Sequence, residues 1–243
     1  MINRYSLAVA FCLLIAGCTG LSSSKSPQNE SKETAEGIYP EPDMMIASAL
    51  EEYRLSLKSV TGEKIAMVTD TLQFGKPESP LGNLVADALR FRAGSELGQF
   101  VNIGIIGEIS FRIFLTPGEL TRGEVMEFMP YDNNLVVLSL TGNKIAELAN
   151  QIAAQGGGPI SGMRFSIADG QARGILVNSQ VLDVNKTYTV ATSNWVANGG
   201  DRYPALWQYT DRIDLDVNIR QLYLDYFKSR REIDPVTDGR IRR

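Results

Sequence analysis

Four segments of the chain place hydrophobic residues three or four positions apart, which is the spacing of an amphipathic helix. Ser79 and Pro80 stand before the second segment, where serine caps a helix and proline favours the first turn. A run of glycines at 156–158 ends the third. The predicted helices cover residues 46–57, 81–89, 144–155 and 217–228.

Apolar or alternating runs of strand length lie between these helices, and each is bounded by Gly, Asn or Asp. The run at 135–138, Leu-Val-Val-Leu, does not alternate, which predicts that both faces of that strand are covered. Because helices and strands interleave, we predict a single α/β (α+β layered) domain with a mixed β-sheet core covered by helices. The predicted strands are 64–74, 100–106, 135–140, 163–167, 175–182 and 187–192.

The beginning of the chain has the pattern of an export signal. Residues 1–17 combine a short polar start, an apolar stretch too short to cross a bilayer, and small residues before Cys18. The sequence Leu-Ile-Ala-Gly-Cys at 14–18 resembles the lipobox of bacterial lipoproteins and predicts that Cys18 is lipidated. The alternative is an ordinary secretory signal followed by an incidental cysteine.

Residues 18–43 are rich in Ser, Lys, Glu, Gln and Pro, which predicts a lipidated cysteine followed by a flexible tether. The folded domain would then occupy 44–243 and contain neither of the two cysteines, Cys12 and Cys18. Because Thr19 and not an acidic residue follows Cys18, we expect a membrane-anchored lipoprotein of the outer membrane that faces the periplasm.

Composition narrows the chemistry that this chain can perform. It contains no histidine, which excludes Ser-His-Asp and Cys-His hydrolases and metal sites built on imidazole. Carboxylates, lysine and bound magnesium stay open. The formal net charge of −4 argues against binding to a nucleic-acid backbone.

Three segments carry unusual combinations of turn, charged and aromatic residues: 78–90, 112–134 and 192–201. Taken in this order, they resemble the C-terminal domain of the 5′-nucleotidases and periplasmic UDP-sugar hydrolases over about residues 60–210. In that family a separate N-terminal domain holds two metal ions on His, Asp and Asn ligands. No segment of this sequence matches that domain.

The resemblance implies a binding site for a nucleoside or nucleotide. The family holds the base and ribose between two aromatic rings, which correspond here to Tyr131 and Trp195. Asp201, in a Gly-Gly-Asp turn, would accept hydrogen bonds from ribose hydroxyls, and Gly200 would let the backbone come close to the ligand. The alternatives are that the two rings are core aromatics, and that Asp201 caps the helix before 204–207.

The resemblance also implies roles for Asn133, Arg112 and Asn102. Asn133 matches a position that helps to hold the ligand, although a turn asparagine also bonds to its own backbone. Arg112 would grip a phosphate bidentately. Asn102 begins the stretch that contains this arginine, but ten residues separate the two, where the family has about five. We interpret three polar residues of the first segment as structural: Glu78, Asn83 and Asp87.

Our leading hypothesis is a substrate-binding part of a 5′-nucleotidase-like phosphoester hydrolase that acts in nucleotide catabolism. A separate metallophosphatase would supply catalysis and the divalent metal, so we expect no catalytic residue, metal or other cofactor in this chain. The alternative is a non-catalytic lipoprotein that binds nucleosides or nucleotides for uptake or sensing. A purely structural or adhesive lipoprotein would bind no such ligand.

Overall fold

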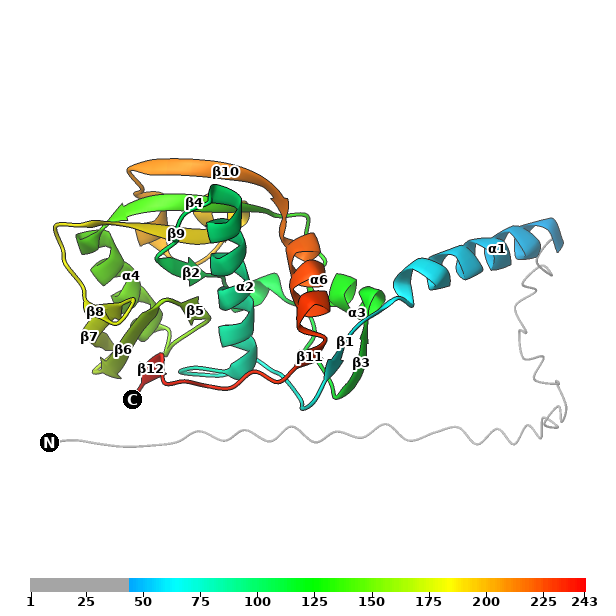
Figure 1. Cartoon of the computed structure of the whole chain (residues 1–243), viewed down its shortest axis with the longest axis horizontal. Coiled ribbons are helices and arrows are strands. Elements are labelled where there is room, and N and C mark those ends of the chain that lie inside the picture. The colour runs from blue at the N-terminus through cyan, green and yellow to red at the C-terminus, as the bar shows by residue number, and fades with distance from the viewer. Residues whose placement is uncertain (1–43) are drawn as a thin grey trace, which may run out of the picture. The chain divides into compact units, whose positions relative to one another are not determined.

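A mixed five-stranded sheet lies at the centre of the computed structural model, which describes residues 44–243 (Figure 1). Its strand order is β10-β4-β9-β2-β5, in which β2 and β9 are parallel and the other neighbours are antiparallel. This sheet confirms the predicted mixed core. The strands are β2 (Ile103–Ile105), β4 (Asn134–Thr141), β5 (Ile160–Ser161), β9 (Thr187–Ser193) and β10 (Asp211–Asn218).

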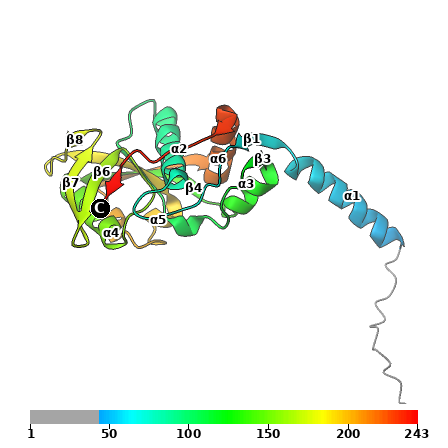
Figure 2. The same cartoon turned by 90° about the horizontal axis from the view of Figure 1, so that it is seen from below.

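Helices cover both faces of this sheet, as Figures 1 and 2 show from two directions. The core on one face contains residues of α2 (Pro80–Leu97), α3 (Arg122–Phe128) and α6 (Ile219–Arg230), and the core on the other contains α4 (Gly142–Ala154). Alternate residues of β4 enter opposite cores: Leu135 enters the first and Val136 the second. The predicted burial of both faces of this strand is therefore confirmed.

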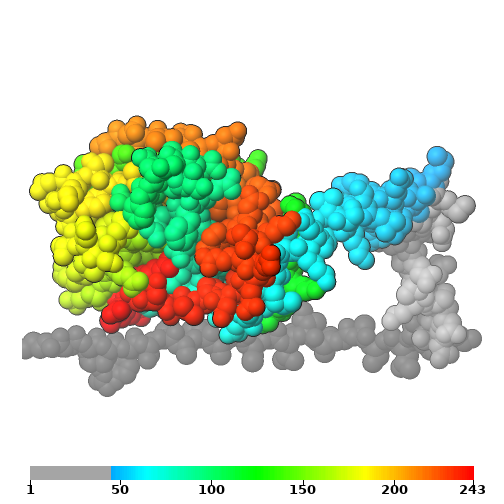
Figure 3. Space-filling view, viewed as in Figure 1, coloured from blue at the N-terminus to red at the C-terminus, as the bar shows by residue number. Residues whose placement is uncertain are grey.

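Two smaller sheets flank the central one. The first has the order β11-β1-β3 and the second β12-β6-β7-β8, and each contains one parallel pair that the C-terminal segment makes. This segment runs along the surface from one sheet to the other (Figure 3, red). The strands are β1 (Lys64–Val68), β3 (Gly118–Thr121), β6 (Met163–Ala168), β7 (Gln171–Val177), β8 (Gln180–Val181), β11 (Glu232–Ile233) and β12 (Ile241–Arg242).

The four predicted helices are confirmed as α1 (Met44–Thr61), α2, α4 and α6. The Ser79 side chain accepts a hydrogen bond from the backbone N–H of Gly82, and Pro80 is the first residue of α2. This helix runs eight residues further than its apolar pattern predicts, to Leu97, and stops where Gly98 adopts a left-handed φ of 61°. Among the described helices, none is long and apolar enough to cross a membrane.

The strand predictions need three corrections. The run 100–106 is a strand only over Ile103–Ile105. The run 64–74 is a strand only to Val68; beyond it, Leu72 makes an isolated bridge with Leu115. The run 175–182 is not one strand but parts of β7 and β8, which form a hairpin. Asn178 and Ser179 turn this hairpin with φ values of 51° and 65°, the left-handed conformation that a two-residue turn requires.

The predicted signal peptide (1–17), the tether (18–43) and the lipidation of Cys18 lie outside the described residues. From Met45 to Arg243 the chain forms one unit, which agrees with the single predicted domain.

Candidate functional site

One end of the central sheet brings the second and third motif segments together. β4 begins at Asn134, directly after the turn that contains Tyr131, and β9 ends at Ser193, directly before the helix that contains Trp195. The two strands are antiparallel neighbours in which Leu135 pairs with Ser193, so the start of one lies beside the end of the other. The backbone N–H of Asn134 also donates to Asn194 Oδ1 at 3.2 Å.

The residues that follow β2 reach the same end of the sheet, because β2 runs parallel to β9. The short 3-10 helix η1 (Glu108–Ser110) follows β2. With the turn before β4 and the helix α5 (Asn194–Ala197), it encloses a cavity of about 250 Å³. The side chains that line this cavity are Ile109, Ser110, Arg112, Tyr131, Asn133 and Trp195.

Both predicted aromatic rings face this cavity. Tyr131 is 36% exposed and Trp195 37%, and neither belongs to the two hydrophobic cores. The indole of Trp195 packs on Gly200: a Cβ atom at that glycine would stand 2.1 Å from the indole Cε2. The Gly200 N–H also donates to the carbonyl of Trp195 at 2.9 Å. Any side chain at position 200 would therefore displace the ring.

The side chain of Arg112 is held by contacts within the site. Its Nη1 donates to the carbonyls of Ile109 at 2.8 Å and Phe111 at 3.3 Å. The guanidinium carbon lies 4.8 Å from the centre of the Tyr131 ring, in a cation–π contact. Arg112 thus stiffens the tyrosine wall of the cavity, and the predicted grip on a phosphate stays a prediction.

Asp201 lies next to the cavity but is not among the residues that line it. Its Oδ1 accepts a hydrogen bond from the Arg202 N–H at 2.7 Å. Its Oδ2 is buried against Gly107, where a Cβ atom would stand 1.4 Å away. The predicted alternative of a helix cap is not observed, because η2 (Pro204–Trp207) has Tyr203 at its cap and no side-chain cap bond.

Burial raises the pKa of the Asp201 carboxyl above its ordinary value of 3.8, and the negative charge of Glu108 adds to this rise. The N–H and the charge of Arg202, together with the charge of Lys76, oppose it. Lys76 Nζ lies 3.1 Å from Glu108 Oε1. The carboxylate beside the cavity is therefore poorly solvated and only partly compensated.

Asn102 lies away from this cavity and has a different set of partners. Its Oδ1 accepts hydrogen bonds from the backbone N–H of Thr189 at 2.9 Å and from its hydroxyl at 3.0 Å. These bonds join the entry of β2 to β9. The sequence analysis assigned no role in the site to Ile109 or Ser110, although both lie just before Arg112 in the chain.

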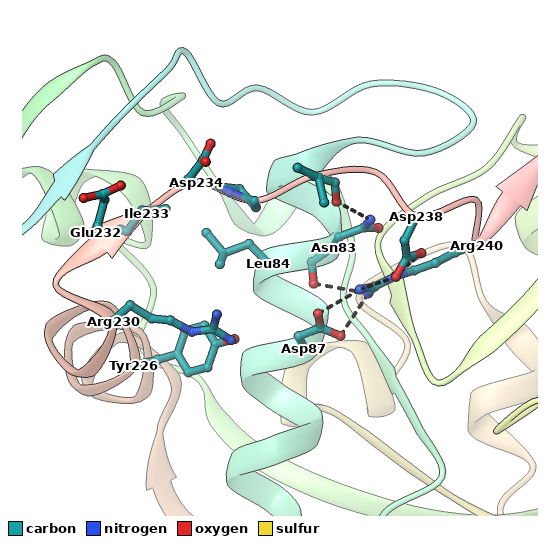
Figure 4. A pocket seen from close by; sticks show the side chains of 12 residues that line it. Asn83, Leu84, Asp87, Tyr226, Arg230, Glu232, Ile233, Asp234, Asp238 and Arg240 are labelled. Atoms are coloured by element: carbon teal, nitrogen blue, oxygen red, sulfur yellow. Dashed lines mark hydrogen bonds and ion pairs between the residues drawn. The ribbon is translucent and has the colours of Figure 1, made fainter.

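The polar residues of the first motif segment bind the C-terminal segment (Figure 4). Asn83 Nδ2 donates to Glu78 Oε1 at 2.7 Å and to the Val236 carbonyl at 3.1 Å. Arg240 grips Asp87 with two bonds of 2.8 and 2.9 Å beside a polar cavity of about 310 Å³. These contacts agree with a structural interpretation of this segment.

Within the described part of the chain, no group of three or more His, Cys, Asp or Glu side chains is placed to hold a metal ion. The site instead offers two aromatic rings, one guanidinium, two neutral polar side chains and one apolar wall. Such a cavity suits a small, flat, largely uncharged ligand. The fold and the site therefore define an α/β domain with a small cavity between two aromatic side chains.

This chain belongs to the family of the 5′-nucleotidase C-terminal domain, whose profile matches residues 59–208. The resemblance inferred from the motifs is thereby confirmed. The chain is 28% identical over 216 residues to the trifunctional nucleotide phosphoesterase protein YfkN of Bacillus subtilis. That alignment covers 79% of this chain and 15% of the relative.

Solved structures show the same fold. The 5′-nucleotidase precursor of Thermus thermophilus superposes with a TM-score of 0.70 at 26% identity, over 82% of this chain and 43% of that protein. The NAD nucleotidase of Haemophilus influenzae gives a TM-score of 0.61 at 19% identity, over 82% and 41%. The chain therefore spans less than half of the length of each of these relatives.

Proposed function

We propose that this chain is the substrate-binding part of a 5′-nucleotidase-like phosphoester hydrolase. Its cavity would hold the base of a nucleoside or nucleotide between Tyr131 and Trp195. The observation that carries this proposal is that two partly exposed rings, from the ends of different strands, line one cavity. Stacking of a base on an aromatic side chain contributes about 1–3 kcal/mol per base.

The size of the cavity supports a ligand that is only partly enclosed. Its volume of about 250 Å³ is below the range of roughly 300–1,000 Å³ that is typical of ligand pockets. We propose that the heterocycle occupies the cavity while the sugar and any phosphate extend toward solvent. Asp201 would bind the ribose from the rim, where its carboxylate lies beside η1.

Catalysis would come from a separate metallophosphatase. The described residues offer no metal cluster, and the sequence has no histidine. The divalent metal and the attacking water would then belong to the partner, while this domain positions the leaving nucleoside. We further propose that the chain is anchored through lipidated Cys18 at a bacterial outer membrane and faces the periplasm.

A second candidate is a non-catalytic lipoprotein that captures nucleosides for uptake or sensing. The arrangement of Arg112 favours this candidate. Its guanidinium is bonded to two carbonyls and lies over Tyr131, so it is already engaged within the site and is not held ready for a phosphate. Both candidates share one cavity and differ in the partner. Co-purification with a metallophosphatase would favour the first, and tight nucleoside binding with no such partner the second.

The aromatic site can be tested by calorimetry and fluorescence. Adenosine should quench Trp195, measured in a Trp207→Phe background because the chain has two tryptophans. Trp195→Ala should weaken adenosine binding by about 1–3 kcal/mol, the contribution of one stacked ring. Trp207→Phe alone should keep the heat of binding, because that residue does not line the cavity. Absence of heat with adenosine, AMP and UDP-glucose at millimolar concentration would refute the proposal.

A further inference from the structure

Buried polar atoms without a hydrogen-bond partner gather around the cavity. In the region 45–243, the buried side-chain oxygens that lack such a partner belong to Glu108, Ser110, Thr192 and Asp201. Folded proteins contain few atoms of this kind, and each needs a physical reason. All four lie in the two segments, 108–110 and 192–201, that build the cavity or adjoin it.

Ser110 is the member of this group that lines the cavity. It is 2% exposed, and its Oγ has no partner. The other three differ: Glu108 has Lys76 at 3.1 Å, and neither Thr192 nor Asp201 is among the lining residues. Ser110 is therefore a lining residue of the cavity whose buried hydroxyl has no hydrogen-bond partner.

The main chain around Ser110 is firmly held. Its N–H donates to the Gly107 carbonyl at 3.1 Å. The next residue, Phe111, is buried, with its ring centre 4.6 Å from that of Phe128 and 5.0 Å from that of Phe74. The hydroxyl can therefore not escape to solvent through a small shift of the backbone, because its neighbour is fixed in the core.

We propose that Ser110 determines specificity by forming a hydrogen bond with the edge of a flat heteroaromatic ring held between Tyr131 and Trp195. This inference rests on the proposed function and assigns the ligand class more narrowly. The ligand would carry a ring nitrogen or an exocyclic amine at the edge that meets Ser110. A serine hydroxyl both donates and accepts, so it suits either group.

The expected discrimination follows from the cost of leaving a buried hydroxyl unpaired. A ligand with the matching edge atom satisfies Ser110, whereas an analogue without that atom leaves the hydroxyl buried and unbonded. Stacking on the two rings is the same for both ligands. We therefore expect the matching ligand to bind about tenfold more tightly.

The test combines ligand analogues with a variant of the protein. Calorimetry on the full chain would compare adenosine with deaza-adenosines, each with one ring nitrogen replaced by CH, and with purine riboside, which lacks the exocyclic amine. In the wild-type protein one of these analogues should bind about tenfold more weakly than adenosine. In Ser110→Ala adenosine should weaken by a similar factor, the affinity of that analogue should not change, and the difference between the two should disappear.

Thr192→Val is the matched control. Thr192 is also buried and its hydroxyl has no partner, but it does not line the cavity. The nearly isosteric variant should keep the full difference between adenosine and the analogue. Thermal unfolding of each variant would verify that it is folded, and the comparison of analogues on the wild-type protein needs no substitution.

The outcomes separate this inference from the proposed function. If the wild-type protein binds adenosine but Ser110→Ala keeps the same differences in affinity between adenosine and its analogues, Ser110 does not determine specificity and the inference is overturned. An equal loss of affinity for every ligand in Ser110→Ala would also overturn the inference, because that result indicates a general effect on the cavity. If the wild-type protein binds no adenosine at all, the proposed function fails, and this inference fails with it.

Discussion

Asp201 is a residue whose burial costs the folded state free energy. Its Oδ2 is buried against Gly107 without a partner, and burial raises the pKa of the carboxyl. The group binds its proton more tightly in the folded state than in the unfolded state. Its contribution to stability is therefore fully present below the ordinary pKa of 3.8 and is lost as pH rises through the raised value.

Asp201→Asn should consequently stabilise the protein at neutral pH and leave stability nearly unchanged at pH values below the ordinary pKa. The amide carries no charge to desolvate and can still accept the hydrogen bond from Arg202. We expect a gain of up to about 1 kcal/mol at pH 7, or about 2–4 °C in the unfolding midpoint. Thermal unfolding measured from below pH 3.8 up to pH 7 would determine this gain in stability.

Asp214→Asn provides a control of opposite sign. A hydrogen bond from Arg212 lowers the pKa of Asp214, so its contribution to stability is present at neutral pH and is lost as pH falls through the lowered value. This variant should lose stability at neutral pH. A loss of stability in Asp201→Asn at pH 7 would contradict our account of the buried carboxylate.

For single residues, the positions of the two aromatic side chains were easier to predict from the sequence than the environment around them. Tyr131 and Trp195 stand in recognisable turn motifs next to strands, so their positions could be inferred. The environment of Ser110 could not, because its burial depends on Phe111 packing against rings from distant segments. Asn102 shows the reverse case: a motif-like residue whose partner, Thr189, is 87 positions away.

Among the elements, α2 depends strongly on its contact with the C-terminal segment. Arg240 is 11% exposed at its side chain and forms paired bonds with Asp87 on α2. The same guanidinium donates to the carbonyl of Ile160 at 2.8 Å. One arginine therefore joins a helix, the edge strand β5 and the segment that leads to β12.

Asp87→Ala should cost about 2–4 kcal/mol, because it leaves the guanidinium of Arg240 largely buried without its main counter-ion. Chemical denaturation measures this change in the free energy of unfolding. Asp238→Ala is the matched control, since Asp238 also pairs with Arg240 but its side chain is 40% exposed. Equal losses in the two variants would show that burial of the ion pair is not what matters.

Elements were predictable where their apolar pattern was long and regular. The helices α1, α2, α4 and α6 met that condition. β10 was not predicted: Ile213, Leu215 and Val217 alternate in it, but they are separated by aspartates, so the strand contains few apolar residues. β3 and α3 are four and seven residues long, which is too short for a periodic signal.

For the whole molecule, the absence of histidine and of a metal cluster within 45–243 leads to a clear expectation about activity. If the proposed metallophosphatase partner supplies the metal-activated water, the purified chain alone should release no phosphate from AMP in the presence of Mn²⁺ or Co²⁺. A colorimetric phosphate assay measures this, with an intact 5′-nucleotidase as positive control. Phosphate release by the chain itself, after contaminating phosphatases have been excluded, would contradict the proposal that a separate protein supplies catalysis.

The pairing of β1 with β11 links the order of synthesis to the order of folding. The hydroxyl of Thr69, just beyond β1, donates a hydrogen bond to the carbonyl of Ile233, a residue that the ribosome adds 164 positions later. Until then one edge of β1 is exposed, and exposed strand edges invite association with other chains. A premature stop after α6 would remove β11 and β12 and leave two sheets with open edges in every copy that is made.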